Sequence, residues 1–224
     1  MRVDSLVLEV GRKCNMHCDH CLRGECEDVE MSFETAKAAI DAVDEINNIT
    51  FTGGEPFLYA DLIIRIAGYL IETKKTVLGF YVVTNGKIIN WDLLTMLIKL
   101  YAYCVDIADE FYGGLVLSVD EYHEDIDDSN KAILSAFKFS DTRSLGSIID
   151  EGRAAENGLG EQRRLSTEFS VYDDCVEMLY VNAKGYIIPD CDYSFESQKD
   201  FEKYIVGERP LEQLIKAFNE EKAA

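Results

Sequence analysis

The feature of this sequence that most restricts its fold is a regular alternation of strand-like and helix-like segments. Strand-like segments occur four times, at residues 3–10, 48–52, 77–84 and 115–119, and residues 77–84 have the composition of a buried strand. A segment with apolar residues at helical spacing follows each one. This alternation predicts a parallel sheet with helices packed outside it, joined by right-handed crossovers.

The helical segments carry recognisable start signals. Their apolar faces are Phe33, Ala36, Ile40 and Val43; then Leu62, Ile63, Ile66 and Leu70; then Leu94, Leu97 and Tyr101. Ser32 precedes the first face and Asn90 the last, and both residue types are good helix N-caps. A fourth helix is expected over about residues 129–139.

The chain length limits how far such a sheet can close. A closed barrel of eight strand–helix units typically needs about 250 residues, and this chain has 224. We therefore expect an incomplete barrel, with residues 145–149 as the candidate fifth strand.

The alternation weakens in the last third of the chain. Residues 176–181 and 186–188 predict a β-hairpin around a turn at residues 182–185. Residues 211–224 have the pattern of an amphipathic helix. We divide the chain into a core of residues 1–165 and a C-terminal extension, residues 166–224, that packs on the core.

The charge balance argues against two classes of partner. Lys and Arg number 22 against 42 Asp and Glu, so the net charge is −20, the wrong sign for holding a phosphate backbone. The N-terminus carries Asp4 where a signal peptide would be apolar, and no apolar run reaches the roughly 18 residues of a membrane span. We expect a cytoplasmic protein that binds neither nucleic acid nor membrane.

Three of the seven cysteines, Cys14, Cys18 and Cys21, crowd into the loop after the first strand. Without a signal peptide, such a group indicates metal or redox chemistry rather than disulfides. Three thiolates on a four-iron cluster leave one iron open to another ligand. The alternative is a structural zinc site with Cys26, His17 or His20 as fourth ligand.

The second strand ends in Gly53-Gly54-Glu55-Pro56. The two glycines allow a ligand to approach the backbone, and the Glu carboxylate suits an ammonium group. Taken alone, the segment is also consistent with a plain turn.

With these two motifs the chain resembles the radical S-adenosylmethionine (radical SAM) enzymes over residues 3–160. The resemblance implies an α/β fold with an incomplete (β/α)6-type radical SAM barrel, a short hairpin and a helical extension. It implies that Cys14, Cys18 and Cys21 hold a [4Fe-4S] cluster whose open iron chelates S-adenosylmethionine. The Gly53-Gly54-Glu55-Pro56 segment would receive the methionyl amino group, and His20 would lie near the adenine.

Other polar residues follow the ends of the later strands, where chemistry lies in barrels of this kind. They are Thr84, Asn85, Ser118, Asp120, His123 and Arg153. By resemblance, Thr84 and Asn85 lie at the cofactor, Ser118 and Asp120 contact its ribose or carboxylate, and Arg153 binds its carboxylate. Asp120 and His123 are the candidate catalytic pair, with His123 as a proton shuttle or substrate contact. The alternative for each is an ordinary polar loop residue.

Three further cysteines have less specific interpretations. Cys104 is expected to be a small buried hydrophobe. A hairpin register pairing Val181 with Gly185 would set Cys175 opposite Cys191. The resemblance identifies this segment as a remnant of the auxiliary-cluster hairpin of peptide-modifying members. The alternative is a pair of packed thiols on a hairpin that covers the open barrel edge.

The resemblance also implies an activity. One electron, from a reduced flavodoxin or ferredoxin, would cleave S-adenosylmethionine to methionine and a 5′-deoxyadenosyl radical that abstracts hydrogen from a substrate. Arg12, Lys13 and Arg23 flank the triad and are expected to dock the donor. We expect a peptide or protein substrate. The alternatives are a nucleotide or other small molecule and, in a different class, a non-catalytic zinc-binding interaction module.

Overall fold

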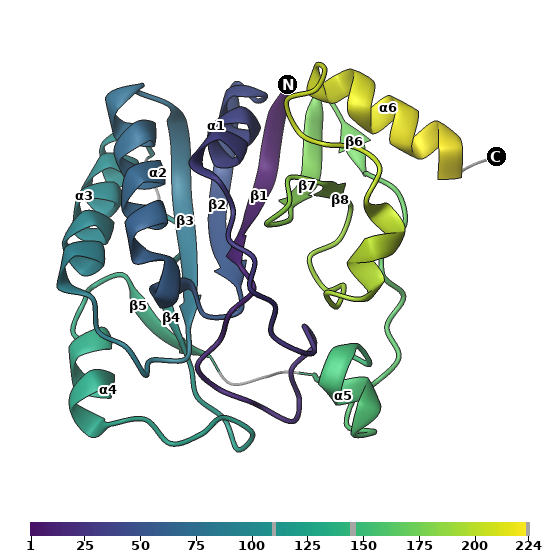
Figure 1. Ribbon diagram of the computed structural model, residues 1–224. Helices are drawn as coiled ribbons and strands as arrows, with labels where there is room; N and C mark the ends of the chain where they lie inside the picture. The colour runs from purple at the N-terminus through teal and green to yellow at the C-terminus, as the bar shows by residue number, and fades with distance from the viewer. Residues whose placement is uncertain (109–110, 144–146, 223–224) are drawn as a thin grey trace.

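The computed structural model describes residues 1–108, 111–143 and 147–222 (Figure 1). Its strands are β1 (Arg2–Gly11), β2 (Glu45–Gly53), β3 (Thr76–Thr84), β4 (Gly114–Ser118), β5 (Ser140–Arg143), β6 (Val171–Tyr172), β7 (Cys175–Val181) and β8 (Ile187–Ile188). Its α-helices are α1 (Phe33–Asp41), α2 (Ala60–Glu72), α3 (Trp91–Ile107), α4 (Asp128–Leu134), α5 (Gly152–Glu156) and α6 (Leu211–Lys222). Two short 3₁₀ helices, η1 (Pro56–Tyr59) and η2 (Ser197–Phe201), complete the described elements.

One sheet organises the chain, in the strand order β5-β4-β3-β2-β1-β7-β6, with β8 paired to β7. The pairs from β5 through to β7 are all parallel, whereas β6 and β8 run antiparallel to β7. The central strand β1 is buried without interruption from Leu6 to Gly11, as expected for a strand in the middle of a parallel sheet. Among the described strands the sheet ends in two edges, β5 and β6. This confirms the expected α/β fold with an incomplete barrel.

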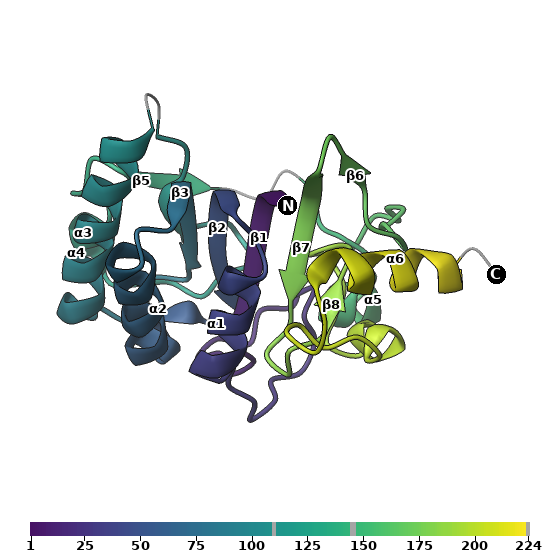
Figure 2. The ribbon, with the colours of Figure 1, turned by 90° about the horizontal axis from the view of Figure 1, so that it is seen from above.

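The helices α1, α2 and α3 lie along one side of the sheet (Figures 1 and 2). The predicted apolar face of α2 is buried in full, from Leu62 to Leu70. Both predicted N-caps are confirmed, since Ser32 accepts a hydrogen bond from Thr35 N and Asn90 accepts one from Leu93 N.

Two predicted elements differ from the structure. The fifth strand is β5, not residues 145–149, of which residues 145 and 146 lie outside the described part of the chain and Ile149 forms only an isolated bridge with Glu161. Because β5 is a polar edge strand with Asp141 and Thr142 exposed, it lacks the apolar run that marks a buried strand. The fourth helix ends at Leu134 rather than near residue 139.

The C-terminal hairpin forms, but its predicted register is wrong. Val181 pairs with Ile187, not with Gly185, because Asn182 N donates to Tyr186 O and closes a three-residue turn. Cys175 therefore pairs with Arg2 and Tyr172 on its two sides and does not face Cys191 across the ladder.

The strand β7 beyond residue 165 extends the sheet of the core, since it pairs with β1 from Arg2↔Cys175 to Leu8↔Val181. The division of the chain near residue 165 stays a prediction. In the part of the chain that the structure describes, no helix combines the length and apolarity needed to cross a bilayer.

Candidate functional site

The cysteine triad lies in the loop after β1, beyond the carboxyl ends of the parallel strands, at the lower edge of the sheet in Figure 1. The segments after β2, β3 and β4 begin at the same edge because these strands are parallel to β1. In α/β folds this edge is where ligands bind.

The triad thiols are free and partly exposed, and their charges act on one another. Burial raises the pKa of Cys14, and burial followed by the charges of Cys21 and Cys14 raises the pKa of Cys18 to about 11. Thiols with such raised values become thiolates at neutral pH only when a cation takes the place of the proton. The donor set therefore fits a positively charged iron–sulfur group.

The spacing of these sulfurs does not match a compact zinc site. Ligands around a tetrahedral zinc ion at about 2.3 Å lie within about 4 Å of one another. Among the described residues, the groups of three or more potential ligand atoms within 4.8 Å of one another do not include the triad. The wider separation suits a polynuclear cluster that keeps each sulfur on a different iron.

Gly53, the last residue of β2, and Gly54, which follows it, are explained by the triad loop itself. A Cβ on Gly53 would lie 2.0 Å from the Gly11 carbonyl oxygen, and one on Gly54 would lie 2.1 Å from the Lys13 carbonyl oxygen. Gly54 N donates to Gly11 O at 2.9 Å, and Glu55 N donates to Lys13 O at 2.8 Å. The absent side chains thus let the backbone entering the triad pass against the end of β2.

Glu55 is buried and ties the ends of β2 and β3 together. Its carboxylate accepts hydrogen bonds from Phe57 N at 3.0 Å, Thr84 Oγ1 at 2.7 Å and Asn85 N at 2.8 Å. Burial raises its pKa, against the opposing effect of these donors. A carboxylate has about four acceptor positions, so room for one further donor, such as an ammonium group, is left.

Asn85 joins β3 to the triad. Its side-chain nitrogen lies 2.8 Å from Asn15 Oδ1 and 3.7 Å from Cys14 Sγ. The structure therefore places Asn85 against the first thiol of the triad, whereas Thr84 bonds the Glu55 carboxylate.

Arg153 is buried against the same loop. Its Nε donates to Cys18 O at 3.0 Å, its Nη1 donates to Gly24 O at 2.8 Å, and its backbone N donates to Cys21 O at 2.9 Å. The guanidinium thus holds the carbonyls of the triad loop, a role that sequence reasoning missed. Its expected contact with a bound carboxylate stays a prediction.

His20, Asp120 and His123 meet beside the triad, although 100 residues separate the first two. The His20 ring centroid lies 4.8 Å from that of His123 and 5.1 Å from that of Tyr122. Burial lowers the pKa of His20. Burial acts to raise the pKa of Asp120, but the adjacent His123 imidazole and Tyr122 N–H outweigh it and lower the value. Ser118, at the end of β4, lines a hollow with Asp120 and His123.

The predicted docking role of Arg12 is wrong. Arg12 is fully buried, with its guanidinium 2.6 Å from Glu9, 2.7 Å from Gln198 and 2.8 Å from Glu27. Its charge is neutralised inside the fold by these partners, which a buried guanidinium requires. It anchors the start of the triad loop to the C-terminal extension.

The other two flanking cations differ from each other. The Arg23 guanidinium donates to Tyr193 O at 2.6 Å and lies over the Tyr180 ring, so its donors also point into the fold. Lys13 is exposed and pairs with Asp28. Lys13 is thus the flanking residue that stays accessible to a partner.

Of the remaining cysteines, Cys26 lies nearest the triad, with its thiol 4.0 Å from the Cys14 carbonyl oxygen. Cys26 is exposed, and Cys104 is fully buried in α3, as expected for a small hydrophobe. Burial, followed by the charge of Asp192, raises the pKa of Cys191 to about 12. Cys175 lies 3.2 Å from the Asp4 carboxylate.

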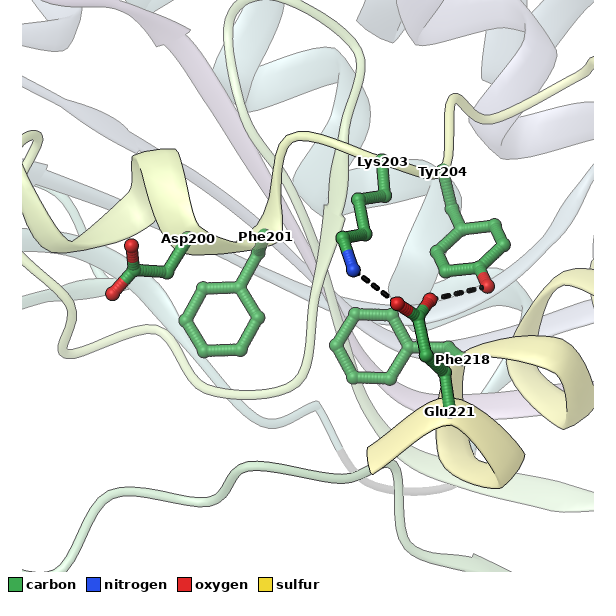
Figure 3. A pocket seen from close by; sticks show the side chains of 6 residues that line it. All are labelled: Asp200, Phe201, Lys203, Tyr204, Phe218 and Glu221. Atoms are coloured by element: carbon green, nitrogen blue, oxygen red, sulfur yellow. Dashed lines mark hydrogen bonds and ion pairs between the residues drawn. The ribbon is translucent and has the colours of Figure 1, made fainter. Parts of the chain in front are cut away.

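A larger pocket, of about 210 Å³, lies in the C-terminal extension (Figure 3). Its lining residues are Asp200, Phe201, Lys203, Tyr204, Phe218 and Glu221. The Glu221 carboxylate binds both Lys203 and Tyr204 there. The pocket includes none of the triad residues, so it is separate from the candidate site.

Comparisons with known proteins agree with this geometry. The model of the radical SAM superfamily matches residues 8–138, more than half of the chain. Over 89 residues the chain is 36% identical to the uncharacterized protein MJ0907 of Methanocaldococcus jannaschii, covering 38% of this chain and 31% of that protein. Over 67 residues it is 46% identical to the AdoMet-dependent heme synthase of Oleidesulfovibrio alaskensis, covering 26% of this chain and 17% of that protein. The matched segments thus span less than a third of these relatives.

A solved structure of anSMEcpe with bound AdoMet and Cp18Cys peptide has a similar fold. Its TM-score is 0.60 at 12% identity, and the superposition covers 99% of this chain and 82% of that one. Radical SAM enzymes use a [4Fe-4S] cluster and S-adenosylmethionine, and the triad described above fits such a cluster. The chain belongs to the radical SAM superfamily.

Proposed function

We propose that this protein cleaves S-adenosylmethionine reductively and uses the product to abstract hydrogen from a substrate. The observation that carries the proposal is the triad of Cys14, Cys18 and Cys21, held by Asn85 and Arg153 at the carboxyl edge of the sheet. When bound, a [4Fe-4S] cluster would pass one electron from an external reductant to the sulfonium, which would split into methionine and a 5′-deoxyadenosyl radical. The protein's own residues hold the cluster, orient the nucleotide and exclude water.

The surrounding residues each bind a different part of the nucleotide. Gly53-Gly54-Glu55-Pro56 receives the methionyl amino group, for which Glu55 keeps one acceptor position. His20 lies beside the adenine, and Ser118 and Asp120 take the ribose or carboxylate. Arg153 holds the loop and offers its remaining N–H groups to the carboxylate.

A peptide or protein is the preferred substrate class. Two features support it: a sheet that ends, among the described strands, in the edges β5 and β6, and the fold shared with a protein whose structure holds a Cp18Cys peptide. A small molecule is the second candidate, favoured by the sequence similarity to AdoMet-dependent heme synthases.

The proposed electron donor is a reduced flavodoxin or ferredoxin. Because Arg12 is buried and Arg23 is engaged inside the fold, Lys13 is the flanking cation left to meet an acidic donor. Charge reversal at Lys13 should slow turnover with such a donor and leave turnover with dithionite unchanged. Equal rates with both reductants would remove Lys13 from the docking surface.

The activity is tested with protein reconstituted anaerobically and supplied with dithionite and S-adenosylmethionine. We expect release of 5′-deoxyadenosine, measured by liquid chromatography and mass spectrometry. Cys18→Ala should abolish this release, whereas the control Cys26→Ala should retain it because Cys26 is exposed and outside the triad. Undiminished product from Cys18→Ala would contradict the site assignment.

The substrate class is tested in a separate experiment. Under the same conditions, candidate precursor peptides and a mononucleotide or tetrapyrrole are tested for loss of two mass units or a new covalent bond. Modification of a peptide supports the preferred class, and modification restricted to small molecules favours the second. Colourless protein that carries zinc and no iron would instead identify a non-catalytic zinc module.

A further inference from the structure

The outer face of α3 carries a stripe of exposed apolar side chains. Trp91 is 62% exposed, Ile98 is 45% exposed and Val105 is 44% exposed. Two further exposed residues fall between them, so the spacing alternates between four and three residues and all members share one face of the helix. This α3 stripe consists of Trp91, Thr95, Ile98, Ala102 and Val105. The Thr95 hydroxyl donates to Trp91 O at 2.7 Å, so its hydrogen bond is made within the helix.

The α3 stripe lies on the side of the helix that is turned away from the sheet. The opposite side holds the buried residues of the helix, which are Leu93, Leu94, Leu97, Leu100 and Cys104. Figure 1 shows α3 at the end of the layer of helices, beside α2. The outward face of α2 has the charges usual for a surface helix, with Asp61, Arg65 and Glu72 exposed. An outward face without any charge, in a chain of which 29% is charged, is typical of a surface that contacts a partner.

One flank of the α3 stripe carries three exposed charged residues, Asp92, Lys99 and Asp106. They follow one another at intervals of seven residues, which place them about 10 Å apart along the helix. Lys99 therefore lies too far from either aspartate to form an ion pair with it in the same chain. The aspartates of a second α3 can supply that pair.

Two copies of α3 complement each other in side-chain size when they run antiparallel. One register packs Trp91 of each copy on Ala102 of the other. The same register packs Ile98 of each copy on Thr95 of the other. Each layer then joins a larger side chain to a smaller one, as layers between paired helices require.

The flanking charges select this same register. It sets Lys99 of each copy beside Asp92 of the other, so that two ion pairs form across the two-fold axis. A shift by one heptad would instead oppose Lys99 to Lys99 and Asp92 to Asp106. A parallel pairing would leave Lys99 without an acidic neighbour, because its flank would face Leu94 of the second copy.

We propose that the protein forms a two-fold symmetric homodimer through the α3 stripe, with the two α3 helices antiparallel. The partner is a second copy because the face complements itself in both size and charge, as an isologous interface must. The flanking Asp92 and Asp106 and the net charge of −20 argue against a lipid surface. Two helices of this length cover an area at the small end of specific interfaces, so the expected Kd is about 1–100 µM.

The first test is sedimentation velocity of the anaerobically reconstituted protein over a range of concentrations. We expect a reversible change from the mass of one chain to that of two. Trp91 is the only tryptophan of the sequence, so its fluorescence emission should shift to shorter wavelength over the same concentration range. Ile98→Lys should raise the Kd at least tenfold without changing the denaturant midpoint of unfolding, because Ile98 is exposed within one chain.

The second test exchanges the charges. Asp92→Lys and Lys99→Asp each oppose like charges in the proposed register, so each variant alone should raise the Kd at least tenfold. An equimolar mixture of the two should form a heterodimer with a Kd near that of the wild type, because every Lys then faces an Asp. Asp61→Lys is the matched control, since Asp61 occupies the first turn of α2 as Asp92 does that of α3. It should leave the dimer intact.

Specific results would overturn the proposal. They are a wild-type protein that stays monomeric at about 1 mM, a dimer that Ile98→Lys leaves unchanged, or a mixture of the two charge variants that stays monomeric. A monomer that binds phosphatidylcholine vesicles with a shift in Trp91 emission would assign the stripe to a lipid surface instead. None of these measurements requires turnover, so failure of the proposed enzymatic activity would not produce any of these results.

Discussion

The side-chain nitrogen of Asn85 lies 3.7 Å from Sγ of Cys14, so the end of β3 touches the first thiol of the triad. Hydrogen bonds to cluster sulfurs are one of the factors that set the reduction potential of an iron–sulfur cluster. They stabilise the more negative, reduced form.

We therefore predict that Asn85→Leu lowers the reduction potential of the bound cluster while iron content is retained. Redox titration followed by electron paramagnetic resonance measures this potential. Asn90→Ala serves as a control because the Asn90 side chain caps α3 by accepting a hydrogen bond from Leu93 N. An unchanged potential in Asn85→Leu would show that the amide does not act on the sulfur.

The glycine pair at the end of β2 gives a prediction about stability. Gly54→Ala would place a Cβ 2.1 Å from the Lys13 carbonyl oxygen, a clash with backbone that cannot move without displacing the triad loop. We expect a loss of about 1–3 kcal/mol in the free energy of unfolding, measured by denaturant titration, together with reduced iron content.

Gly68 in α2 is the matched control, because an added Cβ there meets nothing within 4 Å. Gly68→Ala should be neutral or should stabilise the protein by up to about 1 kcal/mol, since Ala has a higher helix propensity than Gly. Equal effects of the two substitutions would contradict the proposed close approach.

The fully buried Arg12 gives a third prediction. Arg12→Met leaves the Glu9 carboxylate buried without its guanidinium partner, which lies 2.6 Å away. Breaking such a buried pair costs about 3–5 kcal/mol in unfolding free energy. The double variant Arg12→Met with Glu9→Gln should recover part of this loss, because no uncompensated charge stays buried. If Arg12→Met unfolded at the same denaturant concentration as the wild-type protein, the ion pair would contribute little to stability.

Most elements could be predicted because their burial leaves a periodic signal. The face of α2 from Leu62 to Leu70 and the caps Ser32 and Asn90 are local patterns, and all were confirmed. The polar edge strand β5 carries no such signal, and the hairpin register depended on the Asn182 turn, which spacing does not reveal.

The candidate site, too, could be predicted from the sequence only in part. The triad and the glycine pair could be identified from short-range spacing. The proximity of the strand ends could be predicted from the expected parallel sheet. The anchoring roles of Arg12 and Arg153 could not, because their partners Gln198 and Cys18 lie more than 100 residues away. For the same reason the meeting of His20 with His123 was apparent only in the structure.

The thiol pKa values predict a pH dependence in the metal-free protein. Burial and the neighbouring thiols raise the pKa of Cys18 to about 11, so Cys18 is protonated at neutral pH and reacts slowly with iodoacetamide. Its alkylation rate, followed by peptide mass spectrometry, should keep rising until about pH 11. A rate that levels off near pH 8.5, the value of an ordinary thiol, would contradict the crowding of the triad.

The central claim is that three cysteines hold a [4Fe-4S] cluster whose open iron binds S-adenosylmethionine. Its most direct test is the electron paramagnetic resonance spectrum of the reduced, reconstituted protein before and after addition of S-adenosylmethionine. We predict a reduced four-iron signal that changes shape when the nucleotide binds, and no such signal in Cys18→Ala. A signal that is identical with and without the nucleotide, or that persists in Cys18→Ala, would contradict the account.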